Sequence, residues 1–156
     1  MGNVYTKKEK NIKKDTDCQN EDIYRASPKN INKYKRNHKN LICDDDCISR
    51  LVLKKYLVYF GCDVDEAEDG LDAIMKVKEN GVYDVIWMDI KMPKMDGHQC
   101  TYYLRNDMQY TGTIIGLTGY VDDISIKICH TVGMNEVVPK PFDTKIVHTY
   151  VKENRY

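Results

Sequence analysis

Apolar residues fall into short runs that alternate with stretches of helical spacing, from residue 40 to the last residues of the chain. Short apolar runs are typical of strands buried on both faces, and apolar residues three or four positions apart indicate amphipathic helices. The predicted strands lie at or begin at 41–43, 62–64, 84–88, 113–117 and 136–138. The predicted helices carry apolar positions within 48–60, 71–77, 103–104, 124–132 and 146–151.

Each predicted strand is followed by a predicted helix, so residues 40–156 contain five βα units. This alternation predicts an α/β fold with a doubly wound, five-stranded parallel sheet covered by helices on both faces. Ligands of such sheets bind beyond the carboxyl ends of the strands, near a switch in strand order. The polar residues just past the predicted strands are Asp44, Asp45, Asp89, Thr118 and Lys140.

These five side chains form a chemically coherent set. Three carboxylates at one sheet edge repel one another unless a cation lies among them, and Mg²⁺ prefers such oxygen ligands. Asp89 could act as a nucleophile on a phosphoryl group. Lys140 would neutralise charge on the transferring group, and the Thr118 hydroxyl would donate to one of its oxygens. The pattern therefore predicts a Mg²⁺-dependent phosphoryl site at Asp89.

Each residue taken singly has a structural alternative. Asp46, beside the acidic pair, is a candidate helix N-cap. Lys140 before Pro141 could be a solvated turn residue, and Thr118 before Gly119 could simply form a turn. These separate roles leave unexplained why four strand ends carry complementary chemistry.

Four stretches of the sequence occur in the order and spacing of a known family. They are LICDDD at 41–46, WMDIKMPKMDG at 87–97, IIGLTG at 114–119 and GMNEVVPKPF at 133–142. Together they resemble the signature stretches of response-regulator receiver domains, and the resemblance extends over residues 40–156. It implies the flavodoxin-like (βα)5 receiver fold. It also implies that the chemistry is limited to the domain's own aspartyl phosphorylation and dephosphorylation, without enzymatic turnover of another substrate.

The same resemblance assigns roles to the strand-end residues. Asp44 and Asp45 are implied to position Mg²⁺, and Asp89 is implied to be the phosphoacceptor. The backbone carbonyl of Lys91 would complete the protein ligands of the metal. Thr118 would be the hydroxyl that reorients on phosphorylation.

Lys140 is implied to be the lysine that contacts the phosphoryl group. The Lys140–Pro141 bond is expected to be cis, as the family has it and as proline permits. One departure concerns Val137, three residues before the lysine, where the family often has Tyr or Phe that rotates inward. This residue puts the aromatic half of the switch in doubt.

The receiver resemblance further implies a conformational switch. It is expected to involve the loop after Thr118, the helix at about 122–132 and the strand at 137–138. Lys91 and Tyr120 occupy positions that vary in the family and tune the lifetime of the phosphoryl group. Tyr120 could equally be a surface residue that faces a partner.

Charge divides the chain into two regions. Lys and Arg total 24, as do Asp and Glu, but residues 1–39 hold eleven basic and five acidic residues. The remaining thirteen basic and nineteen acidic residues lie in 40–156. The basic segment 1–38 has few aliphatic residues and is predicted to be a disordered tail, ahead of a receiver domain at 39–156. The acidic body disfavours specific nucleic-acid binding.

Other compositional features exclude several classes. The apolar runs are too short for a membrane span, and the sequence shows no signal-peptide core. The six cysteines form no CxxC pair and the four histidines have no metal-ligand spacing, so neither a disulfide framework nor structural zinc is predicted. The expected location is the cytoplasm, where thiols stay reduced.

The implied partners follow from the phosphorelay chemistry. A histidine kinase or a histidine phosphotransfer protein would donate the phosphoryl group from phosphohistidine. Because no output domain follows in the sequence, a stand-alone receiver is expected, with a downstream protein binding the 119–142 face. At the other end, Gly2 and Thr6 fit an N-myristoylation pattern followed by lysines. Acylation would add peripheral membrane association, and the alternative is an ordinary solvated tail.

Two other classes stay open. A phosphatase of the haloacid dehalogenase type also uses Asp and Mg²⁺ on an α/β fold, and Asp44-x-Asp46 formally fits its motif, but Cys47-Ile48 replaces the usual Gly-Thr. A docking module could keep the receiver fold without phosphorylation. The intact set of site residues argues against that module, and Val137 argues weakly for it.

Overall fold

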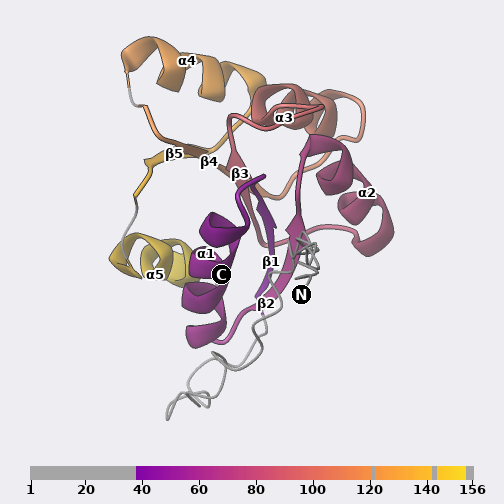
Figure 1. Cartoon of the computed structure of the whole chain (residues 1–156). Helices are drawn as coiled ribbons and strands as arrows, with labels where there is room; N and C mark the ends of the chain where they lie inside the picture. Colours follow the sequence, from indigo (N-terminus) through magenta and orange to yellow (C-terminus); the bar gives the residue numbers. More distant parts are fainter. Residues whose placement is uncertain (1–37, 121, 142–143, 154–156) are drawn as a thin grey trace, which may run out of the picture.

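The protein's structure, a computed structural model, describes residues 38–120, 122–141 and 144–153. Strands and helices alternate along this part of the chain (Figure 1). The strands are β1 (Lys39–Cys43), β2 (Asp63–Ala67), β3 (Val85–Asp89), β4 (Thr113–Thr118) and β5 (Glu136–Pro139). The helices are α1 (Cys47–Tyr59), α2 (Gly70–Asn80), α3 (Gly97–Asn106), α4 (Asp123–Val132) and α5 (Thr144–Glu153).

The strands form one parallel sheet in the order β2-β1-β3-β4-β5. Helices α1 and α5 cover one face, and α2, α3 and α4 cover the other (Figure 1). The chain moves outward from β1 to β2 and then returns to the other side at β3, so the strand order switches between β1 and β3. The predicted doubly wound, five-stranded parallel fold is confirmed.

The core lies in two layers, one on each face of the sheet. Side chains alternate along β3, so Ile86 and Met88 join the layer under α2–α4 while Trp87 joins the layer under α1 and α5. Trp87 is fully buried, donates from Nε1 to Asn40 Oδ1 at 2.9 Å, and meets the Tyr150 ring edge-on. The strand that ends at Asp89 is therefore packed on both faces.

Aspartates begin four of the helices. Asp46, Asp69, Asp96 and Asp122 each accept hydrogen bonds from backbone N–H groups of the first turn. Such caps satisfy donors that have no partner within the helix. Asp46 accepts from the N–H groups of Ile48 and Ser49, so the predicted role of Asp46 as a helix N-cap is confirmed.

Several apolar residues that were predicted from helical spacing point outward. In α1, Ile48 is 66% exposed, whereas Leu53 and Leu57 are buried. In α4, Ile124 is 73% exposed and Cys129 is the one buried residue of that helix, all of whose positions are described. The spacing located both helices correctly but did not identify the buried face, because apolar residues occur on more than one side of each.

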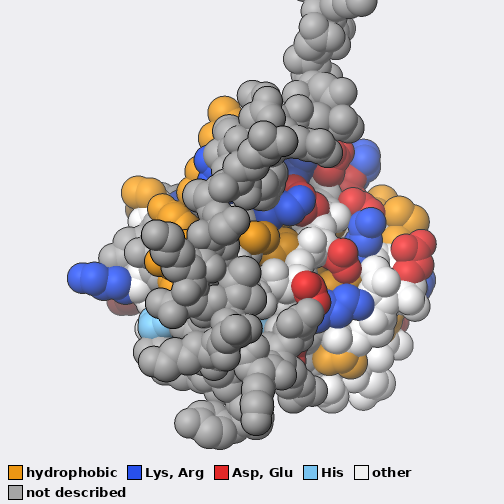
Figure 2. Space-filling model, turned by 90° about the horizontal axis from the view of Figure 1, so that it is seen from below, with side chains coloured by type: hydrophobic (Ala, Val, Ile, Leu, Met, Phe, Trp, Pro, Cys, Tyr) orange, Lys and Arg blue, Asp and Glu red, His pale blue; other side chains and the backbone are white. Residues whose placement is uncertain are grey.

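The segment 1–37 of the predicted tail, and with it Gly2, lies outside the described residues. His38, assigned to the tail by sequence, is buried, and its carbonyl accepts from the Asp63 N–H at 2.9 Å. On the face seen in Figure 2, acidic and basic side chains lie interleaved where described atoms are visible. Among the described helices, none has both the length and the apolar character of a membrane span.

Replacing Asp46 by Ala is expected to destabilise the protein by about 1 kcal/mol, because two backbone N–H groups of α1 lose their acceptor. Urea unfolding followed by Trp87 fluorescence would measure the loss. Asp46→Asn keeps a capping oxygen and should unfold close to the parent. Equal destabilisation by both substitutions would contradict a capping role.

Candidate functional site

Three carboxylates meet at the carboxyl ends of β1 and β3. Cys43 pairs with Met88 in the sheet, so the next residues, Asp44 and Asp89, lie side by side. Asp44, Asp45 and Asp89 each contribute one carboxylate oxygen, and these three oxygens lie within 4.8 Å of one another. Asp44 and Asp89 are buried, whereas Asp45 is exposed. The structure thus brings together the three acidic residues predicted from sequence.

Lys140 completes this cluster from the far side of β4. Its Nζ donates to Asp44 Oδ2 at 2.6 Å and to Asp89 Oδ1 at 2.9 Å. The backbone places it, since the Lys140 N–H donates to the Thr118 carbonyl at 2.6 Å and the following Lys140–Pro141 bond is cis, as predicted. One ammonium group therefore bridges two of the three carboxylates.

Burial and charge act in opposite directions on these groups. Burial raises the pKa of Asp89, and the neighbouring Asp44 charge adds to this, while the hydrogen bond and charge of Lys140 offset part of the rise. For Lys140, burial alone would lower the pKa, but the bonds to Asp44 and Asp89 outweigh it and raise the pKa. The lysine is therefore held as a cation among carboxylates.

This donor set fits Mg²⁺. Its three carboxylates offer hard oxygen ligands within reach of one ion, and the cluster contains more negative than positive charge. The residues that would hold the metal are Asp44, Asp45 and Asp89. The role of the Lys91 backbone carbonyl stays a prediction, and Lys91 lies in the loop that follows β3.

The Thr118 hydroxyl lies at the end of β4 but is turned toward its own loop. It donates to the Tyr120 carbonyl at 2.7 Å and accepts from the Tyr120 N–H at 3.1 Å. Tyr120 is 70% exposed. Val137, at the position where the family often has an aromatic residue, is partly buried against the layer under α2–α4. Contact between Thr118 and a phosphoryl group would require this hydroxyl to leave the turn.

The loop between β3 and α3 packs directly against the end of β3, which carries Asp89. The Gly97 N–H donates to the Ile90 carbonyl at 3.0 Å, and a Cβ on Gly97 would overlap the Asp89 carbonyl oxygen. The absence of a side chain therefore lets α3 begin beside Asp89. This requirement explains the glycine of the WMDIKMPKMDG stretch in local physical terms.

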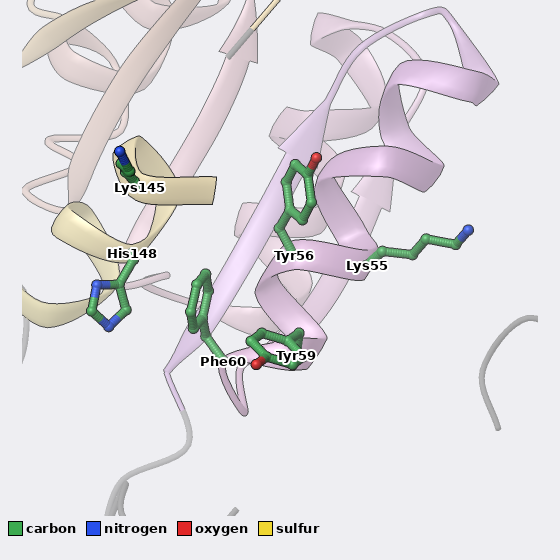
Figure 3. A pocket seen from close by; sticks show the side chains of 6 residues that line it. All are labelled: Lys55, Tyr56, Tyr59, Phe60, Lys145 and His148. Atoms are coloured by element: carbon green, nitrogen blue, oxygen red, sulfur yellow. The ribbon is translucent and has the colours of Figure 1, made fainter. Parts of the chain in front are cut away.

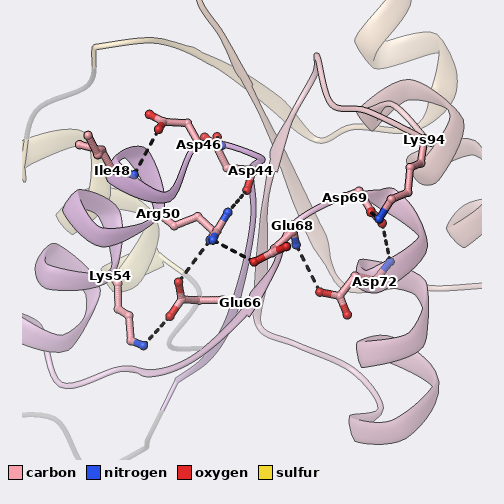
Figure 4. Close-up of polar contacts among 10 residues, drawn as sticks. All are labelled: Asp44, Asp46, Ile48, Arg50, Lys54, Glu66, Glu68, Asp69, Asp72 and Lys94. Atoms are coloured by element: carbon pink, nitrogen blue, oxygen red, sulfur yellow. Dashed lines mark hydrogen bonds and ion pairs between the residues drawn. The ribbon is translucent and has the colours of Figure 1, made fainter. Parts of the chain in front are cut away.

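Two cations outside the predicted set hold the surrounding loops (Figure 4). Lys94, at φ +61°, forms an ion pair with Asp69 at 2.5 Å and so ties the β3–α3 loop to the start of α2. Arg50 of α1 donates to the Asp44 carbonyl at 2.7 Å. Sequence reasoning missed both. For Arg50 the signal was a cation at the spacing of Leu53 and Leu57, on the buried face of its helix.

A separate groove lies between α1 and α5, near the amino ends of the strands (Figure 3). Phe60 and His148 face each other there, with ring centroids 4.8 Å apart. The lining residues are Lys55, Tyr56, Tyr59, Phe60, Lys145 and His148. The acidic cluster lies at the opposite, carboxyl ends of the strands, so this groove is not part of the candidate site.

Comparison with known sequences supplies the family. The sequence model of the response regulator receiver domain matches residues 41–152. The chain belongs to the response regulator receiver family. This receiver is 36% identical over 139 residues to the osmosensing histidine protein kinase SLN1 of Saccharomyces cerevisiae, covering 82% of this chain and 11% of that protein. It is 37% identical over 102 residues to the transcription factor SKN7 of Candida albicans, covering 65% of this chain and 18% of that protein. The receiver thus spans less than a fifth of either relative.

Solved structures agree with this assignment. A two-component response regulator from Clostridium difficile is similar with a TM-score of 0.71 and 30% identity, covering 76% of this receiver and 95% of that chain. A CheX–CheY complex with BeF₃ and Mg²⁺ from Borrelia burgdorferi is similar with a TM-score of 0.69 and 27% identity, covering 74% of this receiver and 87% of that chain. The fold of the receiver is therefore that of CheY-like response regulators.

Replacing Asp89 by Asn should stabilise the receiver at neutral pH in the absence of Mg²⁺. Because the pKa of Asp89 is raised above its ordinary 3.8, the folded state binds this proton more tightly than the unfolded state. Stability from this group is therefore present below pH 3.8 and is lost as the pH rises through the raised pKa. The gain in Tm should appear at neutral pH and vanish below pH 3.8.

Thermal unfolding monitored by circular dichroism, at neutral pH and below pH 3.8, would measure the difference in Tm between Asp89→Asn and the parent. Asp107→Asn is the matched control, because Asp107 is an exposed carboxylate at the end of α3. A lower Tm for Asp89→Asn than for the parent at neutral pH would mean that the pair with Lys140 outweighs the cost of burying the charge.

Replacing Gly97 by Ala should destabilise the receiver by about 1–3 kcal/mol, because the new methyl group would overlap the Asp89 carbonyl. Gly119→Ala is the control, since a Cβ there meets no atom within 4 Å. Urea unfolding of both variants measures the effect. Similar losses in the two variants would argue against a close-approach role for Gly97.

Proposed function

We propose that this receiver accepts a phosphoryl group from a phosphohistidine onto Asp89 and uses it to switch a protein-interaction face. The observation that carries the proposal is the partly buried Lys140 ammonium held between Asp44 and Asp89 at the ends of adjacent strands. That arrangement gathers three carboxylates and one cation, which supports Asp89 as the nucleophile and the carboxylates as metal ligands. The family membership supports the same chemistry.

In the proposed step, an oxygen of the Asp89 carboxylate attacks the phosphorus of the donor. A P–O bond forms while the N–P bond breaks, and its electron pair passes to the imidazole nitrogen, which is then protonated from water. Lys140 is placed to offset charge on the transferring group, and burial excludes competing water from Asp89. Bound Mg²⁺, held by Asp44, Asp45 and Asp89 with the Lys91 carbonyl, would supply further positive charge at the phosphoryl oxygens.

Dephosphorylation returns the receiver to its starting state. Water attacks the phosphorus, the P–O bond to Asp89 breaks, and inorganic phosphate leaves with the Asp89 carboxylate regenerated. We infer no turnover of another substrate. Lys91 and Tyr120 flank the site in sequence. We propose that they determine the rate at which the aspartyl phosphate is hydrolysed.

The readout is proposed to lie on the 119–142 face. The Thr118 hydroxyl, released from Tyr120, would donate to the phosphoryl group and free the loop that precedes α4. Helix α4 has a small buried contact, with Cys129 as its buried residue, and this supports a helix whose position can shift. A downstream protein would bind this face, and the proposed donor is a histidine kinase or a histidine phosphotransfer protein.

The proposed location is the cytoplasm. None of the five described cysteines forms a disulfide, which supports a reducing compartment. Gly2 acylation, with the basic segment behind it, would add attachment to a membrane surface. Stand-alone status stays a prediction, because the curated relatives carry the matching segment within much longer proteins.

The test is phosphorylation of the full chain with acetyl phosphate or phosphoramidate, followed by intact mass. The parent and Asp107→Asn should each gain one phosphoryl group when Mg²⁺ is present. Asp89→Asn should gain none, and omission of Mg²⁺ should abolish the adduct.

Each alternative predicts a different result. Absence of an adduct in a folded parent would overturn the proposal and favour an idle docking module. Sustained hydrolysis of small phosphate esters would instead favour a phosphatase of the haloacid dehalogenase type. Addition to Asp89→Asn at the parent level would place the phosphoacceptor elsewhere.

A further inference from the structure

We infer that Arg50 is a positioning residue for the Mg²⁺ site, holding the backbone that presents Asp44 and Asp45. This inference rests on the proposed function only in taking Mg²⁺ as the ion of the acidic cluster. Arg50 lies on α1, makes no hydrogen bond or ion pair with the carboxylates of Asp44, Asp45 and Asp89, and acts through the Asp44 carbonyl (Figure 4).

The contacts of Arg50 fix its guanidinium group in one place. The residue is 8% exposed. Its Nη1 donates to the Asp44 carbonyl at 2.7 Å, while Nε lies 3.4 Å from Glu66 Oε2 and Nη2 lies 3.4 Å from Glu68 Oε1. Glu66 belongs to β2 and Glu68 directly follows it, so Arg50 links the end of the edge strand to the β1–α1 loop. A planar group with several donors suits this geometry better than an ammonium group does.

Asp45 is the residue that depends most on this link. Asp44 is held at several points: its N–H donates to the Ala67 carbonyl at 3.2 Å, and its carboxylate accepts from the Asp46 N–H and from Lys140. The exposed Asp45 carboxylate forms no hydrogen bond with any described residue. Its direction is therefore set by the peptide plane that begins at the Asp44 carbonyl, and Arg50 holds that carbonyl.

Positioning and simple electrostatics predict opposite signs. Arg50 carries positive charge near the acidic cluster, so on charge alone its removal should strengthen Mg²⁺ binding. If Arg50 holds the ligands in place, its removal should weaken binding, because residues that orient metal ligands typically contribute about tenfold or more to affinity. Arg50→Lys separates the two further, since it keeps the charge and loses the planar group.

The experiment is a Mg²⁺ titration of the full-length protein by isothermal calorimetry, with Trp87 fluorescence as a second signal. Trp87 is the one tryptophan of the chain and lies two residues before Asp89. Arg50→Lys and Arg50→Gln should each raise the Kd for Mg²⁺ about tenfold. Maximal phosphorylation at saturating Mg²⁺ should change little, which a general loss of structure would not allow.

Lys54→Met is the matched control. Lys54 lies one turn further along α1 and pairs with the same Glu66 at 2.5 Å. Its removal deletes a cation from the same helix and should leave the Kd near the parent value. Glu66→Gln weakens the ion pair that holds Arg50 from β2, so it should raise the Kd for Mg²⁺ by a smaller factor. This variant tests the same role if the Arg50 variants do not fold.

The outcomes separate the two ideas. An unchanged or lower Kd in folded Arg50→Lys and Arg50→Gln would overturn the positioning role, even if the parent is phosphorylated. An equal increase in Lys54→Met would also overturn it, because the effect would then come from a general disturbance of α1 and not from the contact between Arg50 and the Asp44 carbonyl. A parent that binds Mg²⁺ with the expected variant pattern but takes no phosphoryl group would overturn the proposed function and leave the role of Arg50 supported.

Discussion

The repulsion among three carboxylates at the ends of β1 and β3 is the constraint on which the rest of the site depends. Adjacent parallel strands bring Asp44 and Asp89 together, and burial raises the pKa of Asp89. Lys140 offsets part of this cost by bonding to both. The negative charge that remains fits the proposed binding of a divalent cation.

A site with such strong internal repulsion needs rigid support, and the support comes from backbone and cation contacts around it. Arg50 holds the β1–α1 loop and pairs with Glu66 of β2 and Glu68 of the following turn. Lys94 holds the β3–α3 loop through its ion pair with Asp69 at the start of α2. The close approach of Gly97 to Asp89 fixes the start of α3. These contacts leave the β1 and β3 ends tightly held. In contrast, among the described residues the Thr118 hydroxyl bonds only to Tyr120, and α4 buries little, so the mobile part of the molecule is expected on that side.

Much of the fold and most of the site could be predicted from local patterns. Apolar runs followed by helical spacing identified every βα unit, because strands covered on both faces carry continuous apolar residues. The rule that ligands bind at the carboxyl ends of strands selected Asp44, Asp45, Asp89, Thr118 and Lys140. The structure brings four of them into one cluster and places Thr118 at the neighbouring strand end.

The sequence by itself determined the order of the elements, the residues at the strand ends and the helix caps, since each depends on neighbours close in the chain. Only the tertiary structure decided which helix faces are buried, as Ile48, Ile124 and Arg50 illustrate. It also decided that the Thr118 hydroxyl bonds to Tyr120 and that Arg50 reaches the Asp44 carbonyl. Periodicity reports that a helix has an apolar side. Which side is covered, and which polar groups meet, depends on how distant segments pack.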